Sequence, residues 1–83
     1  SDLTSNLEAG YGRSDITLQS VSPKNINVIL EFKQGENIDQ LKEEALKQIL
    51  DNQYYTGLTG EVLCVGIAHD KKRCDIAYKT INV

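Results

Sequence analysis

The fold of this chain is decided by residues 26–33, which read INVILEFK. The middle of this stretch is apolar on both faces of an extended chain, which is typical of a central strand covered on two sides. Residues 34–37, QGEN, break that pattern, and the apolar residues of 38–54 then recur at helical spacing. A buried strand that leads into an amphipathic helix predicts an α/β domain.

Four more strands are expected around this strand and helix. They span residues 2–8, 15–21, 62–68 and 74–81. Residues 15–21 alternate between polar and apolar, as a strand with one buried face does, whereas residues 62–68 are apolar almost throughout. The predicted order is β-β-β-α-β-β, a mixed sheet of about five strands with one main helix packed on one face.

The predicted helix has recognisable signals at both ends. Asn37 precedes it and is suited to accept a hydrogen bond from the first backbone N–H groups. After it, Gly57 or Gly60 can adopt the left-handed conformation that often ends a helix. Lys42 falls within the apolar stripe of the helix, so its stem is expected to run outward and to place its charge in water.

The composition predicts a single small domain over residues 1–83. Hydrophobic residues are 40% and charged residues 25% of the chain, which argues against disorder and against a disulfide scaffold. No apolar run approaches the roughly 18 residues that span a bilayer, and no secretory leader is expected. Cys64 and Cys74 fit neither a disulfide framework nor a zinc site, so a reducing, cytoplasmic setting is expected.

The net charge of the chain is −3, from nine Lys and Arg against twelve Asp and Glu. This balance argues against a broad nucleic-acid surface, because phosphate contacts need basic side chains. The acidic excess can be local, however. Glu8, Asp15 and Glu31 gathered in one metal site would account for all of it.

The tripeptide at the end of residues 26–33 is a candidate catalytic group. Residues two apart on a strand share a face, so Glu31 and Lys33 project together and Phe32 projects oppositely. A hairpin centred near Pro23 would place Asp15 directly opposite Glu31, with Cβ atoms about 4.5–5.5 Å apart. Two such carboxylates favour a hard cation such as magnesium, and Lys33 beside it could orient or deprotonate a water. The simpler alternative is a solvated edge with a weak ion pair.

Longer motifs surround this tripeptide. They are SNLEAGYGRSD at residues 5–15, ILEFK at 29–33, and ALKQI at 45–49 followed by Tyr54. In these motifs the chain resembles the PD-(D/E)XK nuclease superfamily, specifically the nuclease-like domain at the C-terminus of certain bacterial AAA-ATPase-like proteins. The resemblance covers residues 5–68 and implies a restriction-endonuclease-like fold that hydrolyses nucleic acid.

The resemblance implies a role for each matching residue. Asp15 and Glu31 would bind magnesium or manganese, with the backbone carbonyl of Phe32 as a third ligand. Lys33 would position the attacking water and stabilise the charge that develops on phosphorus. Gln48 would reach toward the site from the flank of the helix.

Further residues of the resemblance lie in its first segment. Glu8 would either join the metal ligands or pair with Arg13, and the sequence does not decide between the two. Tyr11 and Arg13 would contact the nucleic-acid strand, for which DNA is the expected substrate. Gly10 and Gly12 have the simpler explanation that they bend the chain.

The chain departs from this family in one respect. Superfamily cores usually open with a helix before the first strand, and here that helix is expected to be missing, as in a fragment or a reduced variant. One face of the sheet would then stay uncovered, which predicts a homo-oligomer or a swapped dimer. No P-loop is present in the sequence, so no nucleotide-binding half is expected.

Residues outside these motifs have simpler interpretations. His69 ends an apolar strand and is expected to be structural, and Cys64 is expected in the core. The residues Lys71, Lys72 and Arg73 form a charged turn that is either solvated or in contact with a phosphate backbone. The sequence therefore predicts a metal-dependent nuclease, with a catalytically silent interaction or oligomerisation module as the alternative.

Overall fold

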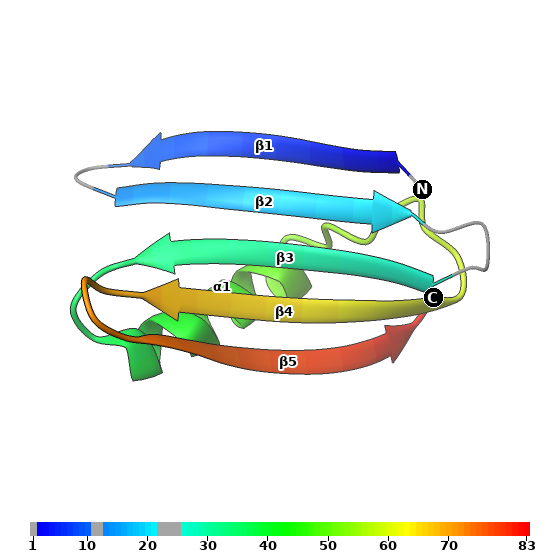
Figure 1. Cartoon of the computed structure of the whole chain (residues 1–83). Coiled ribbons are helices and arrows are strands. Elements are labelled where there is room, and N and C mark those ends of the chain that lie inside the picture. Colours follow the sequence, from blue (N-terminus) through cyan, green and yellow to red (C-terminus); the bar gives the residue numbers. More distant parts are fainter. Residues whose placement is uncertain (1, 11–12, 22–25) are drawn as a thin grey trace.

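The computed structural model describes residues 2–10, 13–21 and 26–83, with side chains from Asn27 onward. Its elements, in chain order, are β1 (Asp2–Gly10), β2 (Arg13–Val21), β3 (Ile26–Gln34), α1 (Ile38–Asp51), β4 (Glu61–His69) and β5 (Cys74–Asn82). The strands form a sheet in the order β1-β2-β3-β4-β5 (Figure 1).

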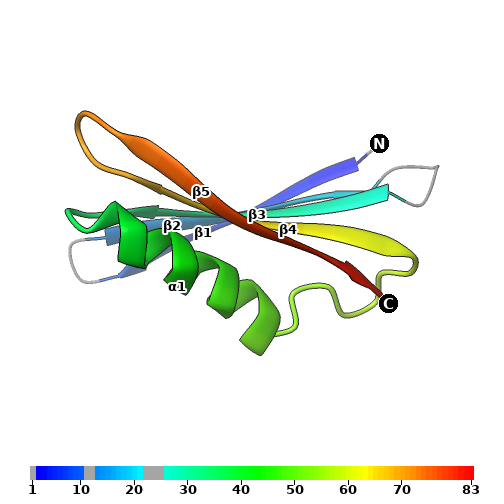
Figure 2. The same ribbon diagram turned by 90° about the horizontal axis from the view of Figure 1, so that it is seen from below.

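The sheet is mixed because α1 carries the chain from β3 to a parallel neighbour, β4. The other neighbouring strands are antiparallel. Helix α1 lies on one side of the sheet and packs on β3, β4 and β5 (Figure 2). A mixed sheet with a helix on one face confirms the predicted α/β class.

The core lies between α1 and the sheet. One cluster joins Ile29 of β3, Ile49 of α1, and Val62 and Cys64 of β4. The helix approaches β4 most closely at Gly66, where an added Cβ would lie 2.4 Å from the carbonyl oxygen of Lys42. Only a residue without a side chain permits this approach, so Gly66 determines how near α1 sits to the strands.

The opposite face of the sheet is covered by no element that the structure describes (Figure 2). On it, Val65 of β4 pairs with Tyr78 of β5, and Ile67 pairs with Ile76. Ile76 is 49% exposed and Tyr78 is 68% exposed. This agrees with the expected uncovered face, and the oligomer or swapped dimer inferred from it stays a prediction.

Helix α1 begins where the sequence predicts and ends earlier. The Asn37 side chain accepts a hydrogen bond from the Gln40 backbone N–H at 3.3 Å, which confirms the predicted N-cap. The helix ends at Asp51, so the prediction that it continues to residue 54 is wrong. Gln53 adopts the left-handed conformation with φ 52°, ahead of Gly57 and Gly60. Asp and Asn at 51 and 52 are poor helix formers, which accounts for the earlier end.

The predicted register between the second and third strands is also wrong. Val21 pairs with Asn27, so Glu31 lies opposite Thr17 and not opposite Asp15. A turn centred on Pro23 would pair Val21 with Asn25, so the observed pairing is displaced by two residues. A two-residue shift leaves every position on the face that was predicted for it, whereas a one-residue shift would reverse the faces.

The Lys42 side chain does not end in bulk water as predicted. Its Nζ lies 2.6 Å from Asp75 Oδ2 of β5, and the side chain is 23% exposed. This ion pair joins α1 to the edge of the sheet. The hydrogen bond from Lys42, together with the Ile76 backbone N–H, lowers the pKa of the Asp75 carboxyl below its ordinary value of 3.8.

Asp75→Asn is expected to destabilise the chain near neutral pH and to have little effect in acid. Because the folded-state pKa of Asp75 is depressed, its stabilisation is present above the unfolded pKa and is lost as pH falls through the folded value. Urea unfolding at about pH 7 and about pH 2.5 measures this. Asp39→Asn is the matched control, because Asp39 is exposed and lies 3.8 Å from the same lysine. A stability gap between wild type and Asp75→Asn that is equal at both pH values would contradict the expectation.

Candidate functional site

A row of alternate residues on β3 faces α1. Asn27, Ile29, Glu31 and Lys33 are paired with β4 residues that pack under the helix. Glu31 is fully buried and Lys33 is 6% exposed. An apolar strand would place an aliphatic side chain at each of these positions. Two ionisable groups at the carboxyl end of the row are therefore its unusual feature.

Small residues surround this pair. Glu31 is paired with Gly66 and Lys33 with Ala68, and the backbone of α1 lies directly on Gly66 next to Glu31. Glu31 is therefore fully buried beside the point where α1 comes closest to the sheet. A buried carboxylate costs several kcal/mol unless cations or hydrogen-bond donors offset it. Lys33, two residues away on the same face, is a cation built into the same strand, and both side chains have interaction partners.

The register brings the other acidic positions to the same face. Asp15 directly precedes Ile16, which pairs with Phe32, and Asp15 lies two residues before Thr17, the partner of Glu31. Positions two apart share a face, so the position of Asp15 is on the Glu31 side of the sheet. Their side-chain contacts fall outside the described part of the chain, so a joint role of Asp15 and Glu31 stays a prediction.

Glu8 lies opposite Asp15 in the pairing of β1 with β2. Arg13 pairs with Gly10, which puts its position two residues from Asp15 and on the same face as Glu8. The strand register therefore fits both predicted roles of Glu8, as a metal ligand and as the partner of Arg13. Tyr11 lies outside the described residues.

The helix covers only part of this face. It packs on β3, β4 and β5, and within the described residues it makes no contact with β1 or β2 (Figure 1). The positions of Asp15 and Glu8 therefore lie beyond the edge of the helix, while Glu31 and Lys33 lie on the last strand that it covers.

Gln48 makes a contact that the sequence did not predict. Its side-chain amide donates a hydrogen bond to the Tyr54 hydroxyl at 2.7 Å. Both residues belong to the motif that carries the resemblance. Tyr54 lies beyond the end of α1, and the hydrogen bond joins it to the helix. A role of Gln48 at the metal site stays a prediction, as does the role of the Phe32 carbonyl.

The available donors fit a hard divalent cation. Glu31, Asp15 and Glu8 offer carboxylate oxygens on one face of the sheet, and oxygen ligands suit magnesium and manganese. Among the described side chains, which include neither Asp15 nor Glu8, no three acidic, cysteine or histidine residues are grouped closely enough to hold a metal. Both cysteines are free, and burial raises the pKa of the Cys64 thiol, which disfavours its thiolate as a ligand.

Two residues that position the site were missed by sequence reasoning. Asn27 is buried, and its side-chain amide donates hydrogen bonds to the backbone carbonyls of Thr59 and Glu61 at 2.9 and 3.3 Å, tying the start of β4 to β3. Gly66 allows the close approach of α1. The sequence carried a signal for each residue: Asn27 is an amide within the apolar strand β3, and Gly66 is a lone glycine within the apolar strand β4.

The fold and this buried acid and lysine pair define a small α/β domain of the restriction-endonuclease-like class. A family model for the PD-(D/E)XK nuclease superfamily matches residues 2–79. The chain therefore belongs to the PD-(D/E)XK nuclease superfamily, as its motifs predicted. No curated protein and no solved structure shows significant similarity to it. In the described part of the chain, no helix has the length and apolar character needed to cross a membrane.

Proposed function

We propose that this chain is a metal-dependent nuclease domain that hydrolyses phosphodiester bonds of DNA. The observation that supports this most strongly is the buried pair of Glu31 and Lys33 on the face shared with the position of Asp15, in a chain of this superfamily. A narrower relation to the nuclease-like domains of bacterial AAA-ATPase-like proteins remains a prediction from the motifs.

In this proposal Asp15 and Glu31 hold magnesium or manganese, with the Phe32 carbonyl and Glu8 as further candidate ligands. When bound, the divalent ion supplies Lewis-acid stabilisation and lowers the pKa of a bound water. The Lys33 ammonium orients the attacking water and stabilises the negative charge that develops on the phosphate oxygens. Its low exposure keeps it in one position and strengthens its electrostatic effect.

The remaining predicted residues would bind and orient the substrate. Arg13 is a cation two residues from Asp15 on the same strand, which suits it to a phosphate next to the cleaved bond. Tyr11 would contact the same nucleic-acid strand. Gln48, held by Tyr54, would lie at the edge of α1 as a hydrogen-bond donor or acceptor toward the site.

The experiment that tests this function combines cleavage with metal binding. Supercoiled plasmid, linear duplex DNA and RNA are incubated with the chain and magnesium or manganese, and EDTA serves as the negative control. We expect cleavage of DNA with either metal and none with EDTA. Calorimetric titration is expected to show saturable metal binding in the wild type and none in Asp15→Ala, because that variant loses one of two carboxylate ligands.

Asp51→Ala is the control for removal of a carboxylate. Asp51 lies on the exposed side of α1 and pairs with Lys47, so its loss is expected to leave both metal binding and cleavage unchanged. Absence of saturable binding in the wild type, together with absence of cleavage of every substrate, would overturn the proposed function.

The second candidate is a non-catalytic interaction or oligomerisation module. The exposed Ile76 and Tyr78 on the uncovered sheet face favour it, because exposed apolar patches on sheets are typical of binding surfaces. Under this alternative, sedimentation velocity would show an assembly that Ile76→Ser disrupts and Asp15→Ala leaves intact. Under the nuclease proposal, Asp15→Ala removes cleavage and Ile76→Ser does not.

A further inference from the structure

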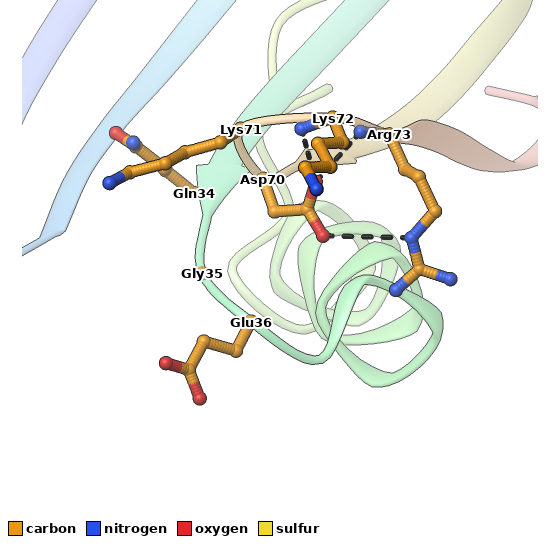
Figure 3. A pocket seen from close by; sticks show the side chains of 7 residues that line it. All are labelled: Gln34, Gly35, Glu36, Asp70, Lys71, Lys72 and Arg73. Carbon is orange, nitrogen blue, oxygen red and sulfur yellow. Dashed lines mark hydrogen bonds and ion pairs between the residues drawn. The ribbon is translucent and has the colours of Figure 1, made fainter.

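A pocket of about 550 Å³ lies at the end of the sheet where β3 and β4 finish. It lies between the β3–α1 connection and the β4–β5 turn, which are joined by a hydrogen bond from the Gly35 N–H to the His69 carbonyl at 3.1 Å. Its lining residues are Gln34, Gly35, Glu36, Asp70, Lys71, Lys72 and Arg73 (Figure 3). Among the residues that the structure describes, the pocket is thus lined by three basic side chains and two acidic ones.

The β4–β5 turn at residues 70–73 is held in one conformation by its own acid. Asp70 Oδ1 accepts hydrogen bonds from the backbone N–H groups of Lys72 and Arg73, both at 2.7 Å. The Asp70 N–H donates to the Arg73 carbonyl at 3.0 Å, and Asp70 Oδ2 lies 3.6 Å from Arg73 Nε. The Asp70 carboxylate is therefore engaged within the turn, and Lys71 and Arg73 extend to opposite sides of it (Figure 3).

The turn carries more basic than acidic side chains, although the chain is acidic overall. Lys71, Lys72 and Arg73 are exposed, and neither lysine forms an ion pair with a residue that the structure describes. Of the two acids in the described lining, Asp70 is engaged by the turn and Glu36 is not. Two exposed lysines without acidic partners, beside an arginine, are complementary to a polyanion.

A second hollow shows which side of this region suits an anion. It has a volume of about 370 Å³ and shares Gly35 and Glu36 with the first pocket. Its other described lining residues are Asn37, Gln40, Leu41 and Glu44, so it holds two carboxylates and no described basic side chain. An incoming phosphate is repelled there and attracted to the β4–β5 turn.

The pocket lies close to the proposed catalytic residues. It begins at Gln34, the residue after Lys33, at the end of the sheet where β2 starts with Arg13 and Asp15. Each strand of B-DNA carries a phosphate about every 3.4 Å along the helix axis. A duplex presents several phosphates along its axis, so one bound at residues 70–73 would extend along this end of the sheet.

We propose that the β4–β5 turn at residues 70–73 binds the phosphate backbone of a DNA duplex whose cleaved bond lies at Glu31 and Lys33. This inference rests on the proposed function and assigns part of its substrate-binding surface. Lys71 and Lys72 contact phosphates, and Asp70 keeps the turn in the conformation that presents them. These contacts are independent of sequence, because phosphates carry no base information.

The test compares the double variant Lys71→Ala/Lys72→Ala with the wild type in binding a labelled DNA duplex. Fluorescence anisotropy in EDTA measures affinity without cleavage and across a range of salt. Loss of two phosphate contacts is expected to reduce the slope of log affinity against log salt by about 1.8. The ratio of wild-type affinity to variant affinity is then expected to fall about tenfold between 50 and 200 mM salt. At 50 mM salt the variant is therefore expected to bind the duplex at least about tenfold more weakly than the wild type.

The control is Lys47→Ala/Lys79→Ala, which changes the net charge equally. Lys47 lies on the exposed side of α1 and Lys79 on β5 away from the turn, so this variant is expected to bind DNA within about twofold of the wild type. Equal weakening in both double variants would mean that only overall charge matters, and would overturn the inference. Unchanged affinity in Lys71→Ala/Lys72→Ala, absence of DNA binding by the wild type, or binding confined to RNA would also overturn it.

Cleavage kinetics separate this inference from the proposed function. If the wild type cleaves DNA, Lys71→Ala/Lys72→Ala is expected to raise KM and to leave kcat within about twofold, because the turn binds without touching the reacting atoms. Cleavage with an unchanged KM in this variant overturns the inference and leaves the nuclease proposal intact. Loss of duplex affinity in the variant, with neither saturable metal binding nor cleavage of any substrate by the wild type, supports the turn as a DNA contact and overturns the nuclease proposal.

Discussion

Gly66→Ala is expected to lower the free energy of unfolding by about 3 kcal/mol or more. A Cβ at this position would lie 2.4 Å from the Lys42 carbonyl oxygen and 2.5 Å from the Leu46 nitrogen. Both atoms belong to the backbone of α1, so no rotation of a side chain can relieve the overlap. The whole helix must move away from β4, and closely packed interiors accommodate such a shift poorly.

Urea unfolding followed by circular dichroism measures this change, and Gly35→Ala is its matched control. A Cβ on Gly35 would also meet an atom at 2.5 Å, but that atom is Cδ1 at the tip of the Leu41 side chain. The tip can rotate aside, so we expect a loss of about 1 kcal/mol or less for Gly35→Ala. Equal stability of Gly66→Ala and the wild type would contradict the close approach of α1 to β4.

Gly66→Ala is also expected to affect the candidate functional site. Gly66 is the β4 partner of the fully buried Glu31, and the helix backbone lies directly over Gly66. If α1 moves outward, water reaches Glu31 and the environment that holds it and Lys33 becomes more polar. Gly66→Ala is therefore expected to affect the proposed catalytic pair as well as the stability of the fold.

The sequence was sufficient to predict the class of the fold because its patterns are strong and local. The apolar middle of residues 26–33 and the helical spacing that follows Asn37 require a buried strand and a helix that covers it. The end of α1 was less predictable. The chain leaves the helix through Gln53 in a left-handed conformation, and a glutamine carries no such signal.

The register between β2 and β3 could not be read from residues 13–33, since it depends on the connection between the strands. The predicted pairing was wrong by two residues, yet the shared face of Asp15 and Glu31 survived because the period of a strand is two. The pocket at residues 34–36 and 70–73 was beyond sequence reasoning for another reason. It is created by the parallel pairing of β3 with β4, which brings together two segments far apart in the chain.

Lys33→Met is expected to reduce kcat for DNA cleavage by about 100- to 1,000-fold while metal binding survives. Methionine keeps an apolar stem of similar length at a position that is 6% exposed, and it removes the charge. In the proposed mechanism that charge stabilises the phosphate as the water attacks, so its loss lowers the rate of the chemical step. A cation beside a metal ion also repels it, so metal affinity is expected to stay equal or to increase.

Glu31→Gln is the comparison variant, which separates the role of a metal ligand from the role of a residue that acts on the substrate. It keeps the shape of the buried side chain and removes the anionic ligand, so metal binding and cleavage are expected to be lost together. Calorimetry and cleavage assays on both variants therefore distinguish a metal ligand from a residue that acts on the substrate. Lys79→Met on the exposed edge strand is the control, and it is expected to retain both activities.

Lys33→Met also removes a cation from the face of β3 that holds the buried Glu31, which can destabilise the fold. Lys33→Arg keeps the charge but moves it to a planar group with different hydrogen-bond directions. We expect this variant to remain folded by circular dichroism and still to lose cleavage, since the water is no longer held in line. Cleavage within about tenfold of the wild type in both Lys33 variants would show that Lys33 only balances the charge of Glu31, because a residue acting in the transition state cannot be replaced at so small a loss.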